Sequence, residues 1–290
     1  MQLPPSLAHA ISTEAERVGI RALSLAAAEL SDAYRARRPI GENYIVSDAH
    51  RLAYATARLP ATYAAVRSVF DQMTPALGAA HMTSMLDLGA GPGTASWAAR
   101  DAYPSLNKFK LVEQDNDLIQ MGKTFAQTAP DEPLSVASWQ CTDLKTQSDF
   151  PEHDLVVCSY TVGELDTGSF PRLVEVAWKA AKVALIIVEP GTVPGFARIR
   201  LIRDQLIGLG AHIAAPCPHA ADCPMSDDDW CHFAQRLDRS SLHRQLKSGS
   251  MGHEDEKFSY IAVTREPVAQ LPSRVLRHPQ RRSGHAHLSL

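Results

Sequence analysis

The spacing of apolar residues along the chain changes near Met82. Before that point, apolar positions recur at near 3.6-residue intervals over residues 5–36 and again over residues 48–77, which predicts amphipathic helices. Pro60 lies inside the second run and predicts a break there. Because neither run alternates in the manner of a strand, we interpret residues 1–78 as a helical N-terminal region.

From Met82 onward, short apolar runs end in acids or glycines and alternate with helical stretches. The runs lie in the segments SMLDLGAGPG, FKLVEQD, LSVASWQCTDL, DLVVCSYTVGEL and ALIIVEPGT. A helix over residues 196–210, a sixth strand over 211–216 and a last strand over 258–266 complete the series. This alternation of strands and helices is typical of a doubly wound parallel sheet, so the sequence predicts an α/β fold with a Rossmann-like core.

The same pattern suggests three further parts after the helical region. We expect the Rossmann-like core over residues 79–210, and the sixth strand with a cysteine-rich insertion over residues 211–256. The closing strand and a basic segment take up residues 257–290.

Composition describes an ordinary globular protein of 290 residues, 45% hydrophobic and 21% charged. No apolar run approaches the length of a membrane span, and the N-terminus lacks the basic and apolar regions of a signal peptide. We therefore expect a cytoplasmic protein, or one of the mitochondrial matrix if the source is eukaryotic, that is monomeric and has no membrane partner. The net charge of −3 means that contact with nucleic acid would depend on local basic patches.

One such patch lies near the end of the chain. From Arg274 to His287 the sequence contains four arginines and three histidines and no acid: Arg274, Arg277, His278, Arg281, Arg282, His285 and His287. This segment is a candidate contact for RNA phosphates, and a solvated basic surface is the alternative.

A glycine-rich turn joins the first predicted strand to the next helix. Gly89, Gly91 and Gly93 let the backbone approach a ligand closely, and the helix N-terminus that follows favours negative charge. Glu113 comes twenty residues after Gly93, at the end of the next strand, where an acid can bind a ribose diol. This spacing alone leaves a dinucleotide site possible, and a turn without a ligand is the structural alternative.

The sequence of the turn, Asp87-Leu-Gly-Ala-Gly-Pro-Gly, resembles the first motif of class I S-adenosylmethionine-dependent methyltransferases. That resemblance implies that Asp87, the three glycines and Glu113 bind S-adenosylmethionine. It places Asp143, at the end of the third strand, near the adenine amino group, and Ser159 and Tyr160 on the methyl-transfer face. A helix cap at Asp143 and a half-buried core position for Tyr160 remain alternatives.

Three of the five cysteines lie close together, at Cys217, Cys223 and Cys231. An odd number of cysteines argues against a disulfide framework and favours metal ligation or plain burial. Intervals of five and seven intervening residues are too wide for a zinc knuckle but compatible with an iron–sulfur cluster. If the sixth strand runs parallel to its neighbours, the insertion emerges at the carboxyl edge of the sheet. Cys141 and Cys158 lie in predicted strands, where burial is the simpler interpretation.

The chain also resembles the methyltransferase-like assembly factors of the mitochondrial small ribosomal subunit and their bacterial relatives. The likeness is carried by RLPATYAAV, LDLGAGPGTASWAA, YTVGEL, EPGTVPGF, CPH, CP, WCHF, EDEKFSYIAVTRE and RRSGHAHLSL. It implies an S-adenosylmethionine fold, a four-cysteine iron–sulfur site of the 4Fe-4S type, and work on small-subunit ribosomal RNA or its assembly. By position its metal ligands are Cys217, Cys223 and Cys231, with zinc as the alternative metal.

The fourth ligand departs from the family pattern. Family members place a cysteine directly after a strand like GHAHLSL, whereas this sequence stops at Leu290. His219 and His232, each near a cysteine, are the neighbouring candidates.

No catalytic residue can be assigned from the sequence. The segment SYTVGEL lacks the Asn- or Asp-Pro-Pro-aromatic motif of amine methyltransferases, and Cys158 lacks the Pro-Cys setting of a cytosine C5 nucleophile. Glu164 and Glu189 could serve as a base, orient a substrate or cap a segment. Three function classes therefore stay open: an RNA methyltransferase, an assembly factor that keeps cofactor and cluster as structural or sensing elements, and a zinc-stabilised protein methyltransferase.

Overall fold

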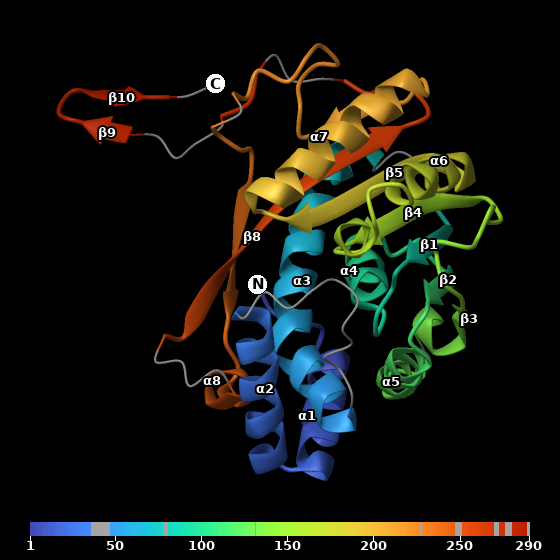
Figure 1. Ribbon diagram of the computed structural model, residues 1–290, viewed down its shortest axis with the longest axis vertical. Coiled ribbons are helices and arrows are strands. Elements are labelled where there is room, and N and C mark those ends of the chain that lie inside the picture. The colour runs from blue at the N-terminus through green and yellow to red at the C-terminus, as the bar shows by residue number, and fades with distance from the viewer. Residues whose placement is uncertain are drawn as a thin grey trace.

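The computed structural model describes most of the chain (Figure 1). The residues outside the description are 36–46, 78–80, 131, 227, 247–250, 270–272, 276–279 and 289–290. The predicted boundary near residue 78 and the basic residues Arg277 and His278 therefore lie outside the described residues. Within the described residues, no helix is both long and apolar enough to cross a membrane.

One mixed sheet organises the molecule, with strand order β3-β2-β1-β4-β5-β8-β6 and β7 paired to β8. The strands are β1 (Ser84–Leu88), β2 (Lys108–Glu113), β3 (Ser138–Cys141), β4 (His153–Ser159), β5 (Ala181–Pro190), β6 (His212–Ala215), β7 (Phe233–Asp238) and β8 (His253–Thr264). Strands β1 to β5 pair in parallel, and β8 is antiparallel to β5. The predicted doubly wound α/β sheet is confirmed.

Strand β6 differs from the expectation that it would run parallel to its neighbours. Its neighbour in the sheet is β8, and the two pair antiparallel from His212 opposite Thr264 to Ala215 opposite Ala262. Because β8 is itself reversed, β6 still points the same way as β1 to β5. The cysteine segment after Ala215 therefore leaves toward the carboxyl edge, as expected.

Helices cover both faces of the sheet. One apolar core joins the sheet to α3 (Asp48–Leu77), α4 (Thr94–Ala102) and α5 (Asn116–Gln127), with α1 (Pro5–Val18) and α2 (Ile20–Arg35) outside them. A second core packs α6 (Phe170–Ala180) and α7 (Val193–Gly208) on the opposite face. Neighbouring strand residues alternate between the two cores: Met85 and Val157 belong to the first, Leu86 and Val156 to the second.

Helix α3 is continuous across Pro60, so the predicted break is wrong. A proline in a helix interior costs about 3 kcal/mol in isolation, but the following turns of α3 are buried against the sheet layer. Polar contacts fix it there as well: the Tyr63 hydroxyl donates to Asp101 at 2.9 Å, and the Tyr260 hydroxyl of β8 donates to Gln72 at 2.8 Å. The earlier helical stretch is instead divided at Gly19, which separates α1 from α2.

The cysteine-rich insertion contains regular structure that the sequence pattern did not predict. Strand β7 pairs along the first half of β8, from Phe233 opposite Phe258 to Asp238 opposite His253, and α8 (Ser241–Leu246) follows it. Near the end of the chain, β9 (Gln280–Arg282) and β10 (His285–His287) form an exposed hairpin that projects from the body of the molecule (Figure 1).

Candidate cofactor site and cysteine cavity

The glycine-rich turn sits where β1 passes into α4. The amides of Gly89 and Ala90 donate to the Val112 carbonyl at 2.9 and 3.0 Å, which ties the turn to β2. All three glycines have positive φ, and a Cβ on Gly89 would approach the Thr161 side chain to 2.3 Å. A Cβ on Gly91 would meet no atom within 4 Å, so the backbone of the turn faces open space there.

Helix α4 begins at this turn with Gly93 as its N-cap in a left-handed conformation. The N-cap glycine makes no side-chain cap, so the amides of Thr94 and Ala95 stay available, while the Ser96 amide interacts with the Asp87 carboxylate. Such a helix N-terminus attracts negatively charged ligand groups, including a carboxylate.

Asp87 lies directly beneath the turn and is fully buried. Its Oδ2 accepts a hydrogen bond from the Ser96 hydroxyl at 2.8 Å, whereas the buried Oδ1 finds no hydrogen-bond partner among the described residues. Removal from water raises the pKa of the Asp87 carboxyl to about 7. An unsatisfied buried carboxylate oxygen is rare in a finished structure, and a cationic group nearby would satisfy it.

Glu113 ends β2 on the other side of the turn. Its Oε2 accepts from the Gly91 amide at 2.8 Å, and its Oε1 accepts from the amides of Gln114 and Asp115 at 2.8 and 3.0 Å. The backbone thus holds the carboxylate rigidly, and Oε2, which accepts one hydrogen bond, keeps a lone pair for a ligand hydroxyl. The sequence placed Glu113 and the glycine turn together, and the structure brings them into contact.

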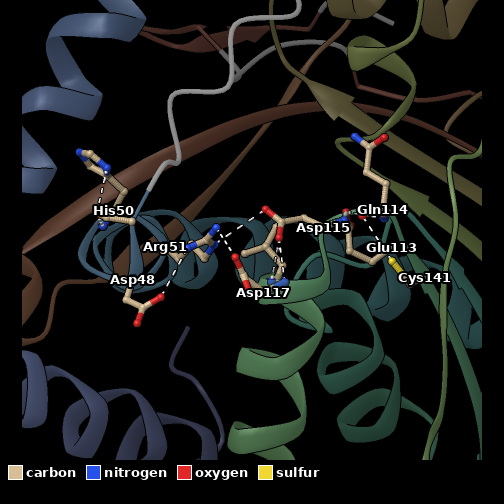
Figure 2. A network of polar contacts seen from close by, with 10 residues as sticks. Asp48, His50, Arg51, Glu113, Gln114, Asp115, Asp117 and Cys141 are labelled. Atoms are coloured by element: carbon tan, nitrogen blue, oxygen red, sulfur yellow. Dashed lines mark hydrogen bonds and ion pairs between the residues drawn. The ribbon is translucent and has the colours of Figure 1, made fainter.

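Helix α3 reaches this edge of the sheet, which sequence reasoning missed (Figure 2). Asp115 caps α5 by accepting from the amides of Asp117 and Leu118, and Arg51 of α3 pairs with Asp117 and, at 3.9 Å, with Asp115. The spacing of Arg51, Tyr54 and Arg58 puts them on one face of α3. The hydrophobic periodicity of α3 alone did not reveal this face.

The remaining predicted cofactor residues lie along the same edge, in different settings. Asp143 follows β3 by two residues, and its Oδ1 accepts from the Lys145 amide at 2.8 Å, so it closes a local turn. Ser159 is buried at the end of β4. Cys141, also at this edge, is exposed, and its thiol donates to the Gln114 carbonyl at 3.5 Å (Figure 2).

Tyr160, just after β4, adopts the left-handed conformation with φ of 57°. Its hydroxyl donates to Glu256 Oε1 at 2.9 Å, and Arg58 donates to both oxygens of Glu256 at 3.0 and 3.2 Å. Burial, helped by the Glu256 charge, raises the pKa of the Tyr160 hydroxyl well above its usual value. Positive φ is unusual for a bulky residue, so the Arg58–Glu256 pair holds Tyr160 in a strained backbone conformation.

Glu189, at the end of β5, is fully buried beside the turn after β4. Its carboxylate accepts from the Gly163 amide at 3.2 Å and pairs with Arg198 at 3.3 Å, while burial raises its pKa to about 7. These contacts hold two loops together. Glu164, in contrast, lies exposed on a short 3₁₀ turn (Val162–Glu164).

The three clustered cysteines line one cavity of about 210 Å³ between α7, the insertion and β8. Three arginines and one histidine share its wall: Arg200, Arg203, Arg274 and His219. Removal from water raises the pKa of the Cys231 thiol to about 11 and also raises that of Cys217, whereas the nearby Arg203 and Arg274 oppose the shift at Cys217. Cys158 is buried in β4, away from this wall.

Thiols are the donors that thiophilic metals prefer, but burial raises the pKa of Cys217 and Cys231 and so favours their neutral form. As they stand, however, no three Cys, His, Asp or Glu side chains of the described residues lie close enough together to hold one metal ion. The sequence correctly grouped the three cysteines. It did not identify Arg203, which lies 14 residues earlier than Cys217 in a helix whose pattern indicates apolar packing.

The sheet order, the reversed β8 and the glycine turn define a class I S-adenosylmethionine-dependent methyltransferase fold. An O-methyltransferase family protein from Burkholderia thailandensis has a similar structure, with a TM-score of 0.55 and 11% identity over 86% of this chain and 72% of that chain. At this identity the likeness concerns the fold alone.

Residues 48–290 match the family model described as "Rsm22: Mitochondrial small ribosomal subunit Rsm22", and the chain belongs to this family. It is 25% identical over 257 residues to the human ribosome assembly protein METTL17, mitochondrial, covering 82% of this chain and 54% of that protein. It is also 25% identical over 246 residues to the Rsm22-cox11 tandem protein 2, mitochondrial, of Schizosaccharomyces pombe, covering 75% and 32%. The chain thus spans about half or less of these relatives.

Proposed function

We propose that this protein binds S-adenosylmethionine and acts on small-subunit ribosomal RNA or in assembly of the small ribosomal subunit. The observation that carries the cofactor half is the buried Asp87, whose free Oδ1 lies beneath an open glycine turn. Membership of the Rsm22 family supports the ribosomal half.

In this proposal, each group at the carboxyl edge has one task. The first-turn amides of α4 and the Gly91 backbone receive the aminoacid part of the cofactor, and Asp87 provides the opposite charge to its ammonium group. Glu113 accepts from the ribose hydroxyls. Asp143 lies toward the adenine, and Ser159 and Tyr160 line the face where a substrate would meet the methyl group. When bound, S-adenosylmethionine supplies an electrophilic methyl group on a sulfonium.

Whether methyl transfer takes place divides the proposal into two forms. The intact turn and Glu113 favour an RNA methyltransferase. The Tyr160 hydroxyl, however, is engaged by Glu256 and thereby tied to Arg58 of α3, and the segment after β4 offers no carboxamide to hold an amine. This contact favours the second form, an assembly factor that keeps the cofactor as a structural or sensing element.

The cofactor half is tested by titrating purified protein with S-adenosylmethionine in a calorimeter, with Asp87→Ala as the comparison. We expect saturable binding in the wild type and none in the variant. Failure of the wild type to bind would overturn this half while leaving the ribosomal half standing.

The ribosomal half is tested by co-sedimentation with small subunits stripped of assembly factors, together with transfer of labelled methyl groups to their RNA. Binding with RNA labelling supports the methyltransferase form, and binding without labelling supports the assembly-factor form. Absence of binding would contradict both forms.

The cysteine cavity is proposed to hold an iron–sulfur cluster, with Cys217, Cys223 and Cys231 as ligands. The supporting observation is that the three cysteines line one cavity, and cysteine thiolates are the ligands of iron–sulfur clusters. Bound there, a cluster would supply redox-sensitive cross-linking of the insertion; zinc is the alternative metal.

The cluster proposal is tested by anaerobic reconstitution followed by iron and sulfide analysis. The wild type should contain iron and sulfide, and the Cys223→Ser variant should not. Stoichiometric zinc in anaerobically purified protein would replace the cluster with a structural zinc site.

The partner surface is proposed to include the projecting β9–β10 hairpin, whose Arg281 and Arg282 are exposed. The protein is proposed to be a monomer before it meets the subunit. Its compartment would be the mitochondrial matrix in a eukaryote, in keeping with the mitochondrial relatives, and the cytoplasm otherwise.

A further inference from the structure

A wide hollow lies at the amino edge of the sheet, opposite the carboxyl edge that carries the glycine turn. The first residues of β1 to β5 line it, and its volume is about 520 Å³. Three lysines and one histidine are among them: Lys108, Lys110, Lys182 and His153. The two edges are separated by the length of the strands, roughly 17 Å for β1. This amino-edge hollow is therefore distinct from the proposed cofactor site.

The amino-edge hollow lies beside a connection of the sheet that has no helix. Helices α4, α5 and α6 lie in the β1–β2, β2–β3 and β4–β5 connections, whereas residues 142–152, all of which the structure describes, pass from β3 to β4 through turns alone (Figure 1). Lys110 lies opposite Leu86 in the register and so shares the face of the second core, as does Lys108 two residues earlier. The missing helix thus leaves room for the lysine side chains of β2.

The three lysines make no salt bridge or hydrogen bond to another residue that the structure describes. Two carboxylates share the wall, but each lies beside other groups. Asp154 Oδ2 accepts from the amides and hydroxyls of Thr83 and Ser84 at 2.8 to 3.1 Å. Burial lowers the pKa of Arg265 and the charge of Glu152 opposes this shift, so Glu152 lies close to Arg265. The lysine charges therefore stay available to a ligand.

His153 adds a hydrogen-bond acceptor to these positive charges. Its Nδ1 lies 2.8 Å from the Pro151 carbonyl, and because a carbonyl oxygen can only accept, Nδ1 carries the proton. Burial lowers the pKa of His153 despite this bond, and the charges of Lys110 and Lys182 add to the shift, so the ring is neutral at pH 7. In this neutral form Nε2 accepts a hydrogen bond.

The spacing of the lysines suits a chain of phosphates better than one small anion. Lys108 and Lys110 are about 7 Å apart along β2, and Lys182 lies near the start of β5, three strands and roughly 14 Å away. Cations spread in this way can each neutralise a separate phosphate of a nucleic acid and release its counterions. An acceptor among them suits a hydroxyl donor, and the 2′-hydroxyl is the group that distinguishes RNA from DNA.

We infer that the amino-edge hollow binds the ribose-phosphate backbone of RNA, with Lys108, Lys110 and Lys182 on phosphates and His153 accepting from a ribose 2′-hydroxyl. For its ligand the inference rests on the ribosomal half of the proposed function, and it does not depend on the cofactor half. Phosphates and 2′-hydroxyls occur at every nucleotide, so this contact anchors RNA without reading its bases.

The phosphate contacts are tested with the double variant Lys108→Glu and Lys182→Glu, and with Arg21→Glu and Lys123→Glu as the matched control. All four side chains are exposed, and both pairs change the net charge equally. The probe is a labelled single-stranded fragment of small-subunit ribosomal RNA, followed by fluorescence anisotropy over a series of salt concentrations. We expect the hollow pair to bind about tenfold more weakly and to lower the salt slope by roughly 1.4 units, or 0.7 for each lost phosphate. The control pair should keep the slope of the wild type.

Several outcomes of this comparison would overturn the inference. These are equal slopes in the two double variants, a wild type that does not bind the RNA, RNA that inorganic phosphate displaces at constant ionic strength, and a wild type that prefers phosphatidylserine vesicles to RNA. Should the hollow pair fail to fold, Lys110→Gln decides, because an unchanged slope in that variant would contradict the contact. If small subunits bind the folded hollow pair and the wild type equally, the ribosomal half of the proposed function stands and this inference is wrong.

The role of His153 is tested by comparing RNA with DNA of the same sequence. His153→Phe keeps a ring but removes the acceptor, and the exposed His9→Phe is the matched control. One hydrogen bond contributes a factor of about 2–10 in affinity, so we expect His153→Phe to lose that factor for RNA and to bind DNA as the wild type does. The control should keep the RNA preference. A wild type without this preference, or a His153→Phe variant that retains it, would refute the role of His153.

Discussion

Gly91 occupies a backbone position where a side chain would project into open space in front of the proposed cofactor turn. Gly210, after α7, has a similar positive φ of 79° and likewise meets no atom within 4 Å. Both positions impose about 1–2 kcal/mol of strain on a residue with a Cβ, so they form a matched pair.

We expect Gly91→Leu to lower affinity for S-adenosylmethionine at least 100-fold and Gly210→Leu to leave it unchanged. The physical reason is that the leucine at position 91 fills the approach path of the ligand, whereas the strain is common to both variants. Calorimetric titration of the two proteins makes the comparison. Equal affinities would show that the ligand does not approach this turn.

Asp87 makes cofactor binding depend on pH. Its pKa is raised to about 7 by burial, so below neutrality the folded protein holds a proton that must leave before the carboxylate can face an ammonium group. Affinity for S-adenosylmethionine should therefore rise about fivefold from pH 6 to pH 7, and Asp87→Asn should bind weakly without this trend.

The stability of the protein without cofactor should change with pH in the opposite direction. Because the pKa of Asp87 is raised above its value in the unfolded chain, ionising Asp87 destabilises the fold, and the free energy of unfolding falls as pH rises from about 4 to 7. Titrations and thermal melts across this range check both signs.

At the scale of elements, the β9–β10 hairpin is the most exposed piece of regular structure that carries positive charge among the described residues. Arg281 and Arg282 lie on its first strand, and all six strand residues are exposed. Arg274, which the sequence grouped with them, is instead packed inward: it lies over the Phe233 ring and donates to the Pro216 carbonyl and to Gln72. The basic segment therefore divides into a structural arginine and a projecting pair.

Reversal of the projecting pair, Arg281→Glu with Arg282→Glu, should weaken binding to small-subunit RNA and flatten its salt dependence. For every phosphate that the protein no longer neutralises, the slope of log affinity against log salt falls by roughly one unit. A double reversal of exposed lysines on the helical faces, Lys123→Glu with Lys179→Glu, changes net charge equally and should leave the slope in place. The salt slopes of both double variants are measured by fluorescence anisotropy. If the two variants flatten the slope equally, net charge causes the change and the hairpin does not.

Elements with a strong local pattern are predictable from the sequence, and those defined by distant partners are not. The turn from β1 to α4 is predictable because its positive φ angles depend only on the glycines within the turn. Strand β7 is not, because its residues, FAQRLD, gain their place only by pairing with β8, later in the chain. The continuity of α3 through Pro60 escapes prediction for the same reason, since packing against the sheet offsets the local cost. At the site, motif resemblance points to Asp87 and spacing points to Glu113, whereas Arg51, Arg58, Arg203 and Glu256 make contacts across the fold that no spacing reveals.

On the scale of the whole molecule, α3 shares its apolar core with the sheet, and we expect the two to fold together. Its residues Val66, Phe70 and Met73 are fully buried in the same core as the sheet, and the family match begins at its first residue, Asp48.

The fragment 48–290 should therefore fold cooperatively, with a lower melting temperature than the full chain because α1 and α2 no longer cover α3. The fragment 79–290 should not fold, since it exposes the apolar face that α3 covers. Circular dichroism melts of the two fragments test this, and a cooperative transition in 79–290 would restore the boundary at residue 78.

Arg274 bears on the order in which a newly made chain matures. Its guanidinium connects Gln72 of α3, Pro216 at the entrance to the insertion and the ring of Phe233, which are made at widely separated times during translation. Although all three cysteines have been polymerised by residue 231, the wall of their cavity is finished only when residue 274 has left the ribosome. Until then the three thiols lie in an open and oxidisable loop. Thiol labelling of stalled nascent chains ending before and after Arg274 should therefore be stronger in the shorter chains.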